Sequence, residues 1–285
     1  MKALLVALVL GLASTQPLAQ PAAVIEGVQM PAWRERDGKR VPLVPGMELR
    51  AGDRIVSGKE ARVVVRLAEG SMVRLGEDGT LRFARIEPSR EIFRAALEVL
   101  QGAFRFTTDV AAKARKREVS VRVDTVTIGV RGTDFWGRSR AELQVVCLIE
   151  GAIEVGAQGE QPVPMDQPRQ FYRRDKGKTQ PVGFVEPKQL RQWALETDIE
   201  AGKGALRQGG RFSVALLAAA EQSQANSVRN QLREAGYPAE VASSKEGDKT
   251  TYLVRIRHLP SREEAQALAN QLKGRFGIRE PKVSG

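Results

Sequence analysis

Apolar residues recur at every second position through much of the chain. From about residue 24 to 155, short alternating runs are separated by turns rich in Gly, Pro and Asp. Residues 61–67 (ARVVVRL), for example, predict a strand, and the turn at 76–79 (GEDG) separates two further strand-like runs. Period-two alternation with frequent turns is typical of a sandwich, barrel or solenoid. The pattern therefore predicts an all-β domain, solenoid-like or sandwich-like, over residues 24–160.

The most informative part of this domain runs from residue 119 to 155. A strand-like run is followed by the turn-prone segment GVRGTD at 129–134 and by a second strand-like run at 143–149. The two glycines of the turn allow a positive φ or a close backbone approach. We interpret GVRGTD as a structural turn of the β-domain. Its Arg131, and Trp136 just after it, are the residues we expect at a partner-facing edge.

A weak internal repeat supports a stacked β-architecture. The segments at 25–28 (IEGV), 100–104 (LQGAF) and 149–153 (IEGAI) share an apolar residue, Glu or Gln, Gly and a second apolar residue. Recurring strand–turn–strand units suggest stacked hairpins or solenoid coils, and chance similarity among hairpins is the alternative. For residues 91–100 (EIFRAALEVL) the pattern is mixed, and we expect a short helix running into a strand.

From residue 211 the periodicity changes. Helical spacing appears at 221–235 and, after a capping box, at 265–272. Strand-like runs precede, separate and follow these helices at 211–217, 238–242, 251–258 and 278–283. The order βαββαβ corresponds to a ferredoxin-like arrangement of four antiparallel strands with two helices on one face. We therefore predict a second domain, of the α+β class, over residues 211–285.

Residues 161–210 connect the two predicted domains. They begin with a polar segment that contains prolines and basic residues, and continue with a helical pattern at 186–196. Trp193 lies on the apolar face of that helix, and we expect this face to dock on the β-domain. The glycine-rich run at 201–210 predicts a linker.

The N-terminus resembles an export signal. A positive Lys2 precedes an unbroken small and apolar run at 3–13, which Ser, Thr, Gln and Pro then interrupt. This layout predicts a secretory signal peptide over residues 1–20. The run is shorter than the roughly 20 residues of an ordinary membrane span, although an uncleaved anchor stays open as an alternative. Three small residues are candidate cleavage positions: Ala13, Ala19 and Ala22. We expect a periplasmic protein with no membrane span after cleavage.

The composition of the chain limits which partners and which catalytic groups can be expected. The formal net charge of +11 and pI of about 10.1 favour anionic partners, although 34 acidic residues are interspersed with 45 basic ones and the charge also fits simple solubility. Cys147 is the only cysteine, which excludes an intramolecular disulfide, and its apolar neighbours predict a buried thiol. The single histidine, His258, lies outside the β-domain. With no G-x-S-x-G motif and no His/Cys cluster, we predict no enzyme, no metal and no cofactor.

The segment VTIGVRGTDF at 126–135, followed by a valine-rich strand and Glu150-Gly151, resembles the hallmark of the FecR domain. The resemblance covers about residues 24–156. It implies a β-rich extracytoplasmic interaction domain without catalysis. In sensor-type relatives this domain follows a cytoplasmic anti-sigma segment and a membrane helix, whereas this sequence begins with the predicted signal peptide. Extracytoplasmic signalling of the FecR type is therefore kept only as the alternative function.

The C-terminal region is similar to the SPOR (sporulation-related) domain of bacterial cell-wall proteins. The resemblance rests on FSVAL at 212–216, TYLVRIRH at 251–258 and LPSREEA at 259–265. It implies binding to peptidoglycan, with a preference for glycan strands stripped of their stem peptides. The sequence departs from the family in having Ser213 where glutamine is common, and Arg257-His258 where Gly-Pro is common.

The surface implied by this resemblance is the sheet face that the helices leave open. Strand alternation directs Val254 and Ile256 toward the helices. The candidate glycan-binding residues on the opposite face are Ser213, Ala215, Leu253, Arg255 and Arg257. Arg255 is suited to bonding sugar hydroxyls or lactyl carboxylates, and a solvated sheet residue is the plainer alternative.

We therefore expect a non-enzymatic envelope protein, enriched at the division septum. Its C-terminal domain is expected to bind peptidoglycan, and its β-domain to bind an unknown envelope protein. The four-stranded fold is shared with RNA-recognition modules, which stack bases on sheet aromatics. No aromatic platform is predicted on the open face, so we expect no nucleic-acid partner.

Overall fold

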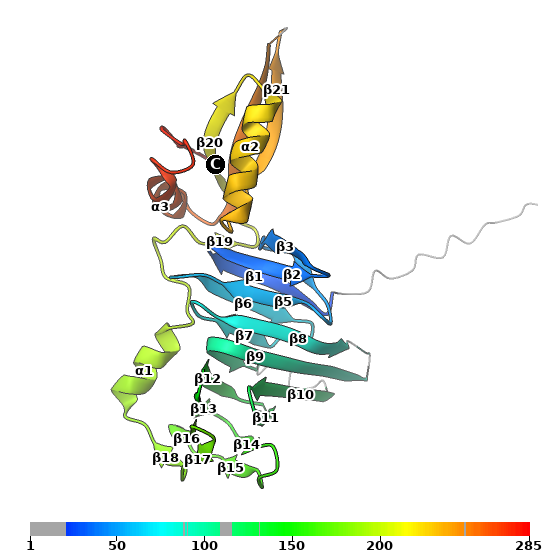
Figure 1. Ribbon diagram of the computed structural model, residues 1–285, viewed down its shortest axis with the longest axis vertical. Coiled ribbons are helices and arrows are strands. Elements are labelled where there is room, and N and C mark those ends of the chain that lie inside the picture. Colours follow the sequence, from blue (N-terminus) through cyan, green and yellow to red (C-terminus); the bar gives the residue numbers. More distant parts are fainter. Residues whose placement is uncertain (1–20, 88, 90, 109–115, 131, 248) are drawn as a thin grey trace, which may run out of the picture.

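The structure is a computed structural model that describes residues 21–87, 89, 91–108, 116–130, 132–247 and 249–285. The predicted signal peptide at 1–20 and Arg131 lie outside the described residues. Figure 1 shows an elongated molecule in which a tall β-rich body carries a smaller α/β unit at one end. The multi-domain architecture and the two fold classes predicted from periodicity are thus confirmed.

The β-rich body consists of two sheets that share one long strand. Sheet A contains β1 (Ala23–Gln29), β4 (Glu48–Leu49), β6 (Arg62–Leu67), β7 (Met72–Leu75), the second part of β9 (Ile92–Thr107), β12 (Asp134–Arg140), β13 (Leu143–Glu150), β16 (Gln170–Asp175), β17 (Lys178–Thr179), β18 (Gly183–Phe184) and β19 (Leu206–Arg207). Sheet B contains β2 (Ala32–Arg36), β3 (Lys39–Pro42), β5 (Arg54–Ser57), β8 (Thr80–Glu87), the first part of β9, β10 (Lys116–Val123), β11 (Val126–Val130), β14 (Ile153–Ala157) and β15 (Val163–Met165). The inward side chains of both sheets form one apolar core. Strands β15 to β18 extend the pairing beyond residue 160.

Strand β9 corrects one sequence prediction. The expected short helix at 91–100 is absent, and a continuous strand takes its place. Alternate residues such as Phe93 and Leu97 are buried, while the strand pairs with β8 on one side and with β10 on the other. Period-two burial and two neighbouring strands therefore outweigh the helical propensity of the AALEVL run.

The repeat has a structural explanation at its glycines. Gly102 lies where β9 passes from sheet B to sheet A, and Gly151 lies between β13 in sheet A and β14 in sheet B. Their φ angles are +91° and +87°, in the region that favours glycine. A side chain at Gly102 would meet Gly79 at 2.6 Å from its Cβ. Two of the three repeat copies thus mark a crossing between sheets, where the backbone needs glycine, whereas Gly27 of the copy at 25–28 lies inside β1.

The C-terminal unit has the predicted βαββαβ order. Its antiparallel sheet runs β21-β22-β20-β23, with strands β20 (Phe212–Ala219), β21 (Glu240–Glu246), β22 (Lys249–Leu259) and β23 (Lys282–Ser284). Helices α2 (Gln222–Glu234) and α3 (Arg262–Leu272) bury Leu232 and Leu268 against the sheet. The Ser261 side chain accepts a hydrogen bond from the Glu264 amide at 3.3 Å, as expected for the N-cap.

The region between the two units is ordered and makes specific contacts. Helix α1 (Pro187–Leu195) lies along sheet A, and β19 pairs with β1. The Glu264 carboxylate accepts hydrogen bonds from the amides of Gly202, Gly204 and Ala205 at 2.7, 2.7 and 3.0 Å. The two units also touch directly. Trp33 Nε1 in β2 donates a hydrogen bond to the Glu234 carbonyl in α2 at 3.2 Å. The glycine-rich run therefore holds the two units together and does not act as a free linker.

Candidate functional site

The five glycan-binding candidates lie on the face of the C-terminal sheet that is opposite to α2 and α3. In β22, Val254 and Ile256 are fully buried on the helix side, and the intervening residues point the other way. The ladder pairs Ala215 with Arg255 and with Lys282, so three strands contribute to the same face. This face is here called the open face, and its residues include Ser213, Ala215, Ala218, Glu240, Ala242, Leu253, Arg255, Arg257, Lys282 and Ser284.

Glu240 is the member of this face that the sequence analysis missed. It stands opposite Arg255 in the β21–β22 ladder, and its Oε1 lies 2.8 Å from the Nε of Arg255. The same oxygen lies 2.8 Å from the Nε of Arg257. One carboxylate therefore holds two guanidinium groups. The sequence predicts a strand at 238–242 but not its register against β22, so this pairing has no local signal.

Small polar residues lie on the open face at the edge of the sheet formed by β20 and β23. The hydroxyl groups of Ser213 and Ser284 are 2.9 Å apart, and the exposed Lys282 precedes Ser284 on the edge strand by two residues. Ala215 lies between Lys282 and Arg255 in the ladder. The short side chains of Ser213, Ala215 and Ser284 thus lie beside the longer cationic side chains of Arg255 and Lys282. A planar or polar ligand can approach the sheet over these short side chains.

His258 adds no charge to this face at neutral pH. Burial is the main cause that lowers its pKa below the usual value, and the neighbouring Arg257 lowers it further. Its φ of +70° is unusual for a residue other than glycine. The positive charge of the open face therefore comes from Arg255, Arg257 and Lys282.

In the β-body, the GVRGTD segment links β11 to β12 and places an acid on sheet A. Asp134 accepts hydrogen bonds from Arg105 Nε at 2.9 Å and from Arg105 Nη2 at 2.6 Å. Both side chains are largely covered, with 13% and 21% of their surface exposed. Arg105 belongs to β9, so this bidentate pair fastens the end of the motif to the neighbouring strand. These contacts support the structural interpretation of the motif.

Trp136 is not at an exposed edge, which corrects the sequence analysis. It is 1% exposed, and its ring stacks on Trp193 of α1 with the centroids 4.7 Å apart. The physical reason is that β12 lies between β9 and β13 and that α1 covers the outward side of the strand. The expected docking of the 186–196 helix through Trp193 is confirmed.

Cys147 is buried beside this tryptophan pair. It is fully shielded from solvent, and burial raises the pKa of its thiol to about 12. The predicted buried thiol is therefore confirmed. His258 lies in the other unit, so the cysteine and the histidine do not form a reactive pair.

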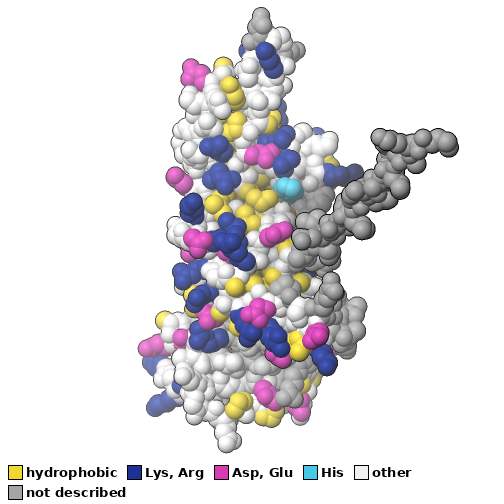
Figure 2. All heavy atoms as spheres, turned by 90° about the vertical axis from the view of Figure 1, so that its right-hand side faces the viewer, with side chains coloured by type: hydrophobic (Ala, Val, Ile, Leu, Met, Phe, Trp, Pro, Cys, Tyr) yellow, Lys and Arg dark blue, Asp and Glu magenta, His cyan; other side chains and the backbone are white. Residues whose placement is uncertain are grey.

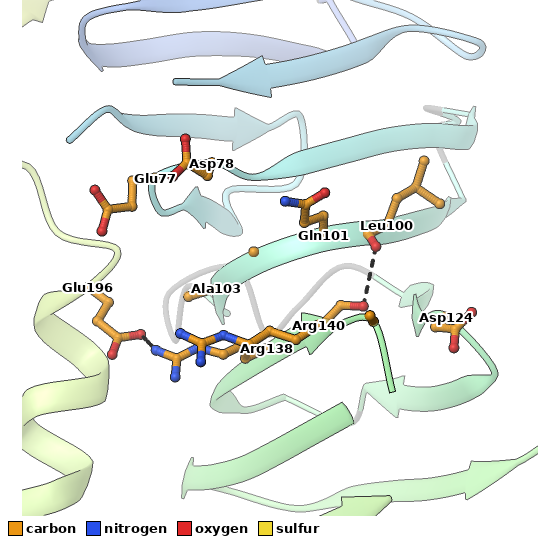
Figure 3. Close-up of a pocket in the computed structure, with 12 residues that line it drawn as sticks. Glu77, Asp78, Leu100, Gln101, Ala103, Asp124, Arg138, Arg140 and Glu196 are labelled. Carbon is orange, nitrogen blue, oxygen red and sulfur yellow. Dashed lines mark hydrogen bonds and ion pairs between the residues drawn. The ribbon is translucent and has the colours of Figure 1, made fainter. Parts of the chain in front are cut away.

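A polar depression of about 680 Å³ opens beside the end of α1. Figure 3 shows Glu77 and Asp78 on one side, Arg138 and Arg140 on the other, and Glu196 reaching Arg138. Leu100, which is 43% exposed, also lines the depression, and its carbonyl accepts a hydrogen bond from Ser139. The depression therefore carries both signs of charge.

Charge is also mixed elsewhere on the body. On the face drawn in Figure 2, Lys and Arg side chains are interspersed with Asp and Glu along the length of the molecule. The net charge of +11 is thus not collected in one patch of this face.

Two families match this chain. Residues 53–154 match the FecR protein family, and residues 208–279 match the SPOR domain family. The chain therefore carries a FecR domain followed by a C-terminal SPOR domain. Both families consist of non-catalytic domains that bind or regulate, and they occur in periplasmic proteins. The SPOR domain supports binding to peptidoglycan.

Similar solved structures include two of a candidate anti-sigma factor from Parabacteroides distasonis ATCC 8503. The first, at 1.65 Å resolution, is 12% identical, with 69% of this chain and 96% of that chain covered and a TM-score of 0.41. The second, at 2.50 Å, is 15% identical, with 77% and 89% covered and the same TM-score of 0.41. No curated protein matches this chain. In the described part of the chain, no helix has the length and apolar character needed to cross a membrane.

Proposed function

We propose that this protein binds the glycan strands of peptidoglycan through the open face of its SPOR domain and another envelope protein through its FecR domain. The observation that carries the proposal is the open face itself. It belongs to a domain of a peptidoglycan-binding family, and neither α2 nor α3 covers it. The proposed glycan-binding residues are Ser213, Ala215, Leu253, Arg255 and Arg257.

The chemistry of this face fits a stripped glycan strand. Serine hydroxyls and guanidinium groups bond sugar hydroxyls, and Arg255 and Arg257 suit carboxylates. Removing a stem peptide leaves a free lactyl carboxylate on the sugar, so a stripped strand presents a series of negative charges. Charge-assisted bonds to these carboxylates are stronger than bonds between neutral groups. We therefore expect a preference for denuded glycan over peptide-bearing glycan.

Glu240 is expected to weaken this interaction. Its single negative charge already pairs with Arg255 and Arg257 and partly neutralises them. A ligand carboxylate has to compete with it for the same donors. Lys282, which extends the face on the edge strand, is the cation best placed to attract the ligand first.

The compartment follows from the same proposal. A SPOR domain acts where peptidoglycan is exposed, so we place the protein in the periplasm after export by its signal peptide. Denuded glycan arises where amidases act, and enrichment at the septum is expected there. Fractionation and a fluorescent fusion would measure both properties.

A second candidate function is extracytoplasmic signalling of the FecR type. The match of residues 53–154 to the FecR family favours it. In that case the partner of the FecR domain would belong to a signalling system. Co-purification with a sigma-factor regulator, or a neighbouring gene for a sigma factor, would favour signalling over simple attachment to the wall.

Retention of the full chain on purified sacculi tests the proposed function. We expect more protein to sediment with amidase-treated sacculi than with untreated ones. The double variant Arg255→Ala with Arg257→Ala should lose most of this retention. Arg262→Ala is the matched control, because this exposed arginine lies on α3, on the other side of the sheet. Wild-type protein that sediments with neither form of sacculus would refute glycan binding.

A further inference from the structure

The outer face of sheet A, turned away from the core, carries a row of arginines from four adjacent strands. Arg62, Arg74, Arg105 and Arg138 belong to β6, β7, β9 and β12 in turn. Arg74 and Arg105 stand directly opposite each other in the β7–β9 ladder. Like charges in that position repel each other. Such a row needs negative charge from elsewhere.

Part of the negative charge lies on the sheet itself, where Asp134 pairs with Arg105. The rest comes from residues 193–200, here called the acidic strap, which comprise the last three residues of α1 and the turn that follows it. The strap carries an acid at every second position from Glu196 to Glu200. Glu196 pairs with Arg138, and Glu200 lies 3.6 Å from Arg62. Between them, Asp198 lies 3.5 Å from Arg74 and 3.9 Å from Arg105. The strap thus crosses all four strands, and its acids pair with all four arginines.

The sheet provides room for the strap. A side chain at Gly76 would come within 2.7 Å of the Glu196 carbonyl, and one at Gly27 within 3.0 Å of the Ile199 side chain. The Glu200 amide donates to the side chain of Gln29 at 2.9 Å. Glycines at these two positions allow the strap to lie close to the sheet. The part of the outer face that the strap covers is here called the groove.

An aromatic site ends this groove. Trp193 stacks on Trp136, and Cys147 lies in the same small apolar cluster beneath α1. The peptide that occupies the groove thus combines one aromatic anchor with acids three, five and seven residues further along the chain.

Most residues of the strap are partly exposed, and Thr197 is its fully buried residue. No residue of α1 is buried, and Leu195 at its end is 64% exposed. The side chains of Asp198 and Glu200 are 40% and 48% exposed. Ion pairs with exposed members contribute little to stability. The strap competes well because it belongs to the same chain and so has a high effective concentration.

We propose that the outer face of sheet A is the surface through which the FecR domain binds its partner, and that the partner presents an acidic segment with an aromatic anchor, arranged like the end of α1 and the turn that follows it. This segment displaces residues 193–200 and takes over their contacts. The inference rests on the proposed function, in which the FecR domain binds a protein. It goes further in naming the surface, the chemistry of the partner and the segment of this chain that must leave.

Cys147 provides a native reporter, because it lies beneath α1 and is the only cysteine. The test uses the full chain and the triple variant Glu196→Gln, Asp198→Asn, Glu200→Gln. We expect a maleimide to modify Cys147 at least about tenfold faster in the triple variant. The control variant, Asp37→Asn, Glu87→Gln, Glu118→Gln, removes three exposed ion-pair acids elsewhere and should react at the wild-type rate.

The probe for binding is a labelled synthetic peptide of residues 186–203. It should bind the triple variant at least about tenfold more tightly than wild type, since the wild-type groove is occupied. It should also slow the reaction of Cys147. A peptide with the three acids replaced by amides should not bind, and adding Arg74→Gln and Arg138→Gln to the triple variant should abolish binding of the acidic peptide.

Two further measurements distinguish a failure of this proposal from an effect of one particular variant and from a failure of glycan binding. Trp193→Ala leaves every ion pair in place and should also speed modification of Cys147, so the idea does not depend on one variant. The proposal is overturned if Cys147 reacts at the wild-type rate in both variants, or if the acidic peptide binds the triple variant no better than wild type. Retention on amidase-treated sacculi should be unchanged in these variants, so glycan binding is judged independently.

Discussion

The two basic sheet faces of this chain differ in where their negative charge comes from. On the open face, Arg255 and Arg257 share Glu240, which lies on the adjacent strand. On the outer face of sheet A, Asp134 pairs with Arg105, and the acidic strap, more than 50 residues further along the chain, contacts all four arginines. The first face stays accessible while its charge is partly neutralised. The second is covered, and its availability depends on a segment that can leave.

This comparison shows that arginine content alone does not identify a binding surface. Arg105 is engaged by Asp134 and approached by Asp198, and only 21% of its side chain is exposed. Arg257 is half exposed, at 50%, and lies beside open solvent. The same residue type is therefore covered by other segments of the chain in one place and left half-exposed in the other. Arg105 and Arg257 differ because other segments of the chain pack over Arg105 and leave Arg257 exposed to solvent.

The largest expected difference between the two faces is in stability. Trp136→Ala removes a fully buried ring and leaves a cavity beneath α1, so we expect a loss of about 3–5 kcal/mol in the free energy of unfolding. Leu253→Ala on the open face should cost about 1 kcal/mol or less. Thermal and denaturant melts followed by circular dichroism measure both. Equal losses in the two variants would mean that the faces are covered to the same extent.

A smaller but clear contrast is expected between two arginines. Arg105→Ala leaves the Asp134 carboxylate largely buried without its bidentate partner, and we expect a loss of about 1–3 kcal/mol. Arg255→Ala removes a pair whose side chains are 32% and 37% exposed, for which a loss of up to about 1 kcal/mol is expected. Retention on amidase-treated sacculi should show the reverse order, with Arg255→Ala the weaker binder. If Arg105→Ala lost retention without any loss of stability, the assignment of the two faces would be wrong.

Glu240→Gln sharpens the interpretation of the open face. The change removes the carboxylate that occupies Arg255 and Arg257 while it keeps the shape of the side chain. We expect affinity for amidase-treated sacculi to rise by about threefold, which corresponds to less than about 1 kcal/mol. Glu263→Gln, an exposed acid on α3, is the matched control. Weaker retention of Glu240→Gln would show that Glu240 positions the arginines for the ligand and does not compete with it.

The smallest expected effect concerns His258. Because burial and Arg257 lower its pKa in the folded state, the unfolded chain binds its proton more readily. The stability associated with the neutral form is present above the unfolded pKa of about 6.5 and is lost as the pH falls through the folded pKa. We expect the free energy of unfolding to fall between pH 7.5 and 5.5 in wild type, and to fall less in His258→Asn.

Asparagine is chosen for this variant because it tolerates the φ of +70° at this position. Urea melts at a series of pH values measure the difference between the two proteins. An identical pH dependence in wild type and His258→Asn would contradict the effect assigned to the histidine.

Much of this fold could be predicted from local patterns. The alternation around Val254 and Ile256 correctly assigned the helix side and the open side of β22. The same period-two pattern indicated the β-rich body, and Trp193 correctly marked the docking face of α1. These features depend on which side of a strand or helix a residue faces, and backbone geometry fixes that within a few residues.

The errors and omissions have one physical origin. The expected helix at 91–100 became part of β9 because β8 and β10 pair with it from both sides. Trp136 was expected at an edge, but α1 covers it. Glu240 was missed because the register of β21 was not known. Each of these depends on a contact between segments that are distant along the chain.

The sequence by itself determined the two domain types, the phase of their strands and the position of the chemistry-bearing side chains on the C-terminal sheet. Only the tertiary structure decided which basic face is open and which is covered. The reason is that alternation is a property of each strand alone, whereas cover and counter-charge come from whichever segment packs there. That choice depends on the sum of many weak long-range contacts, which no single stretch of sequence contains.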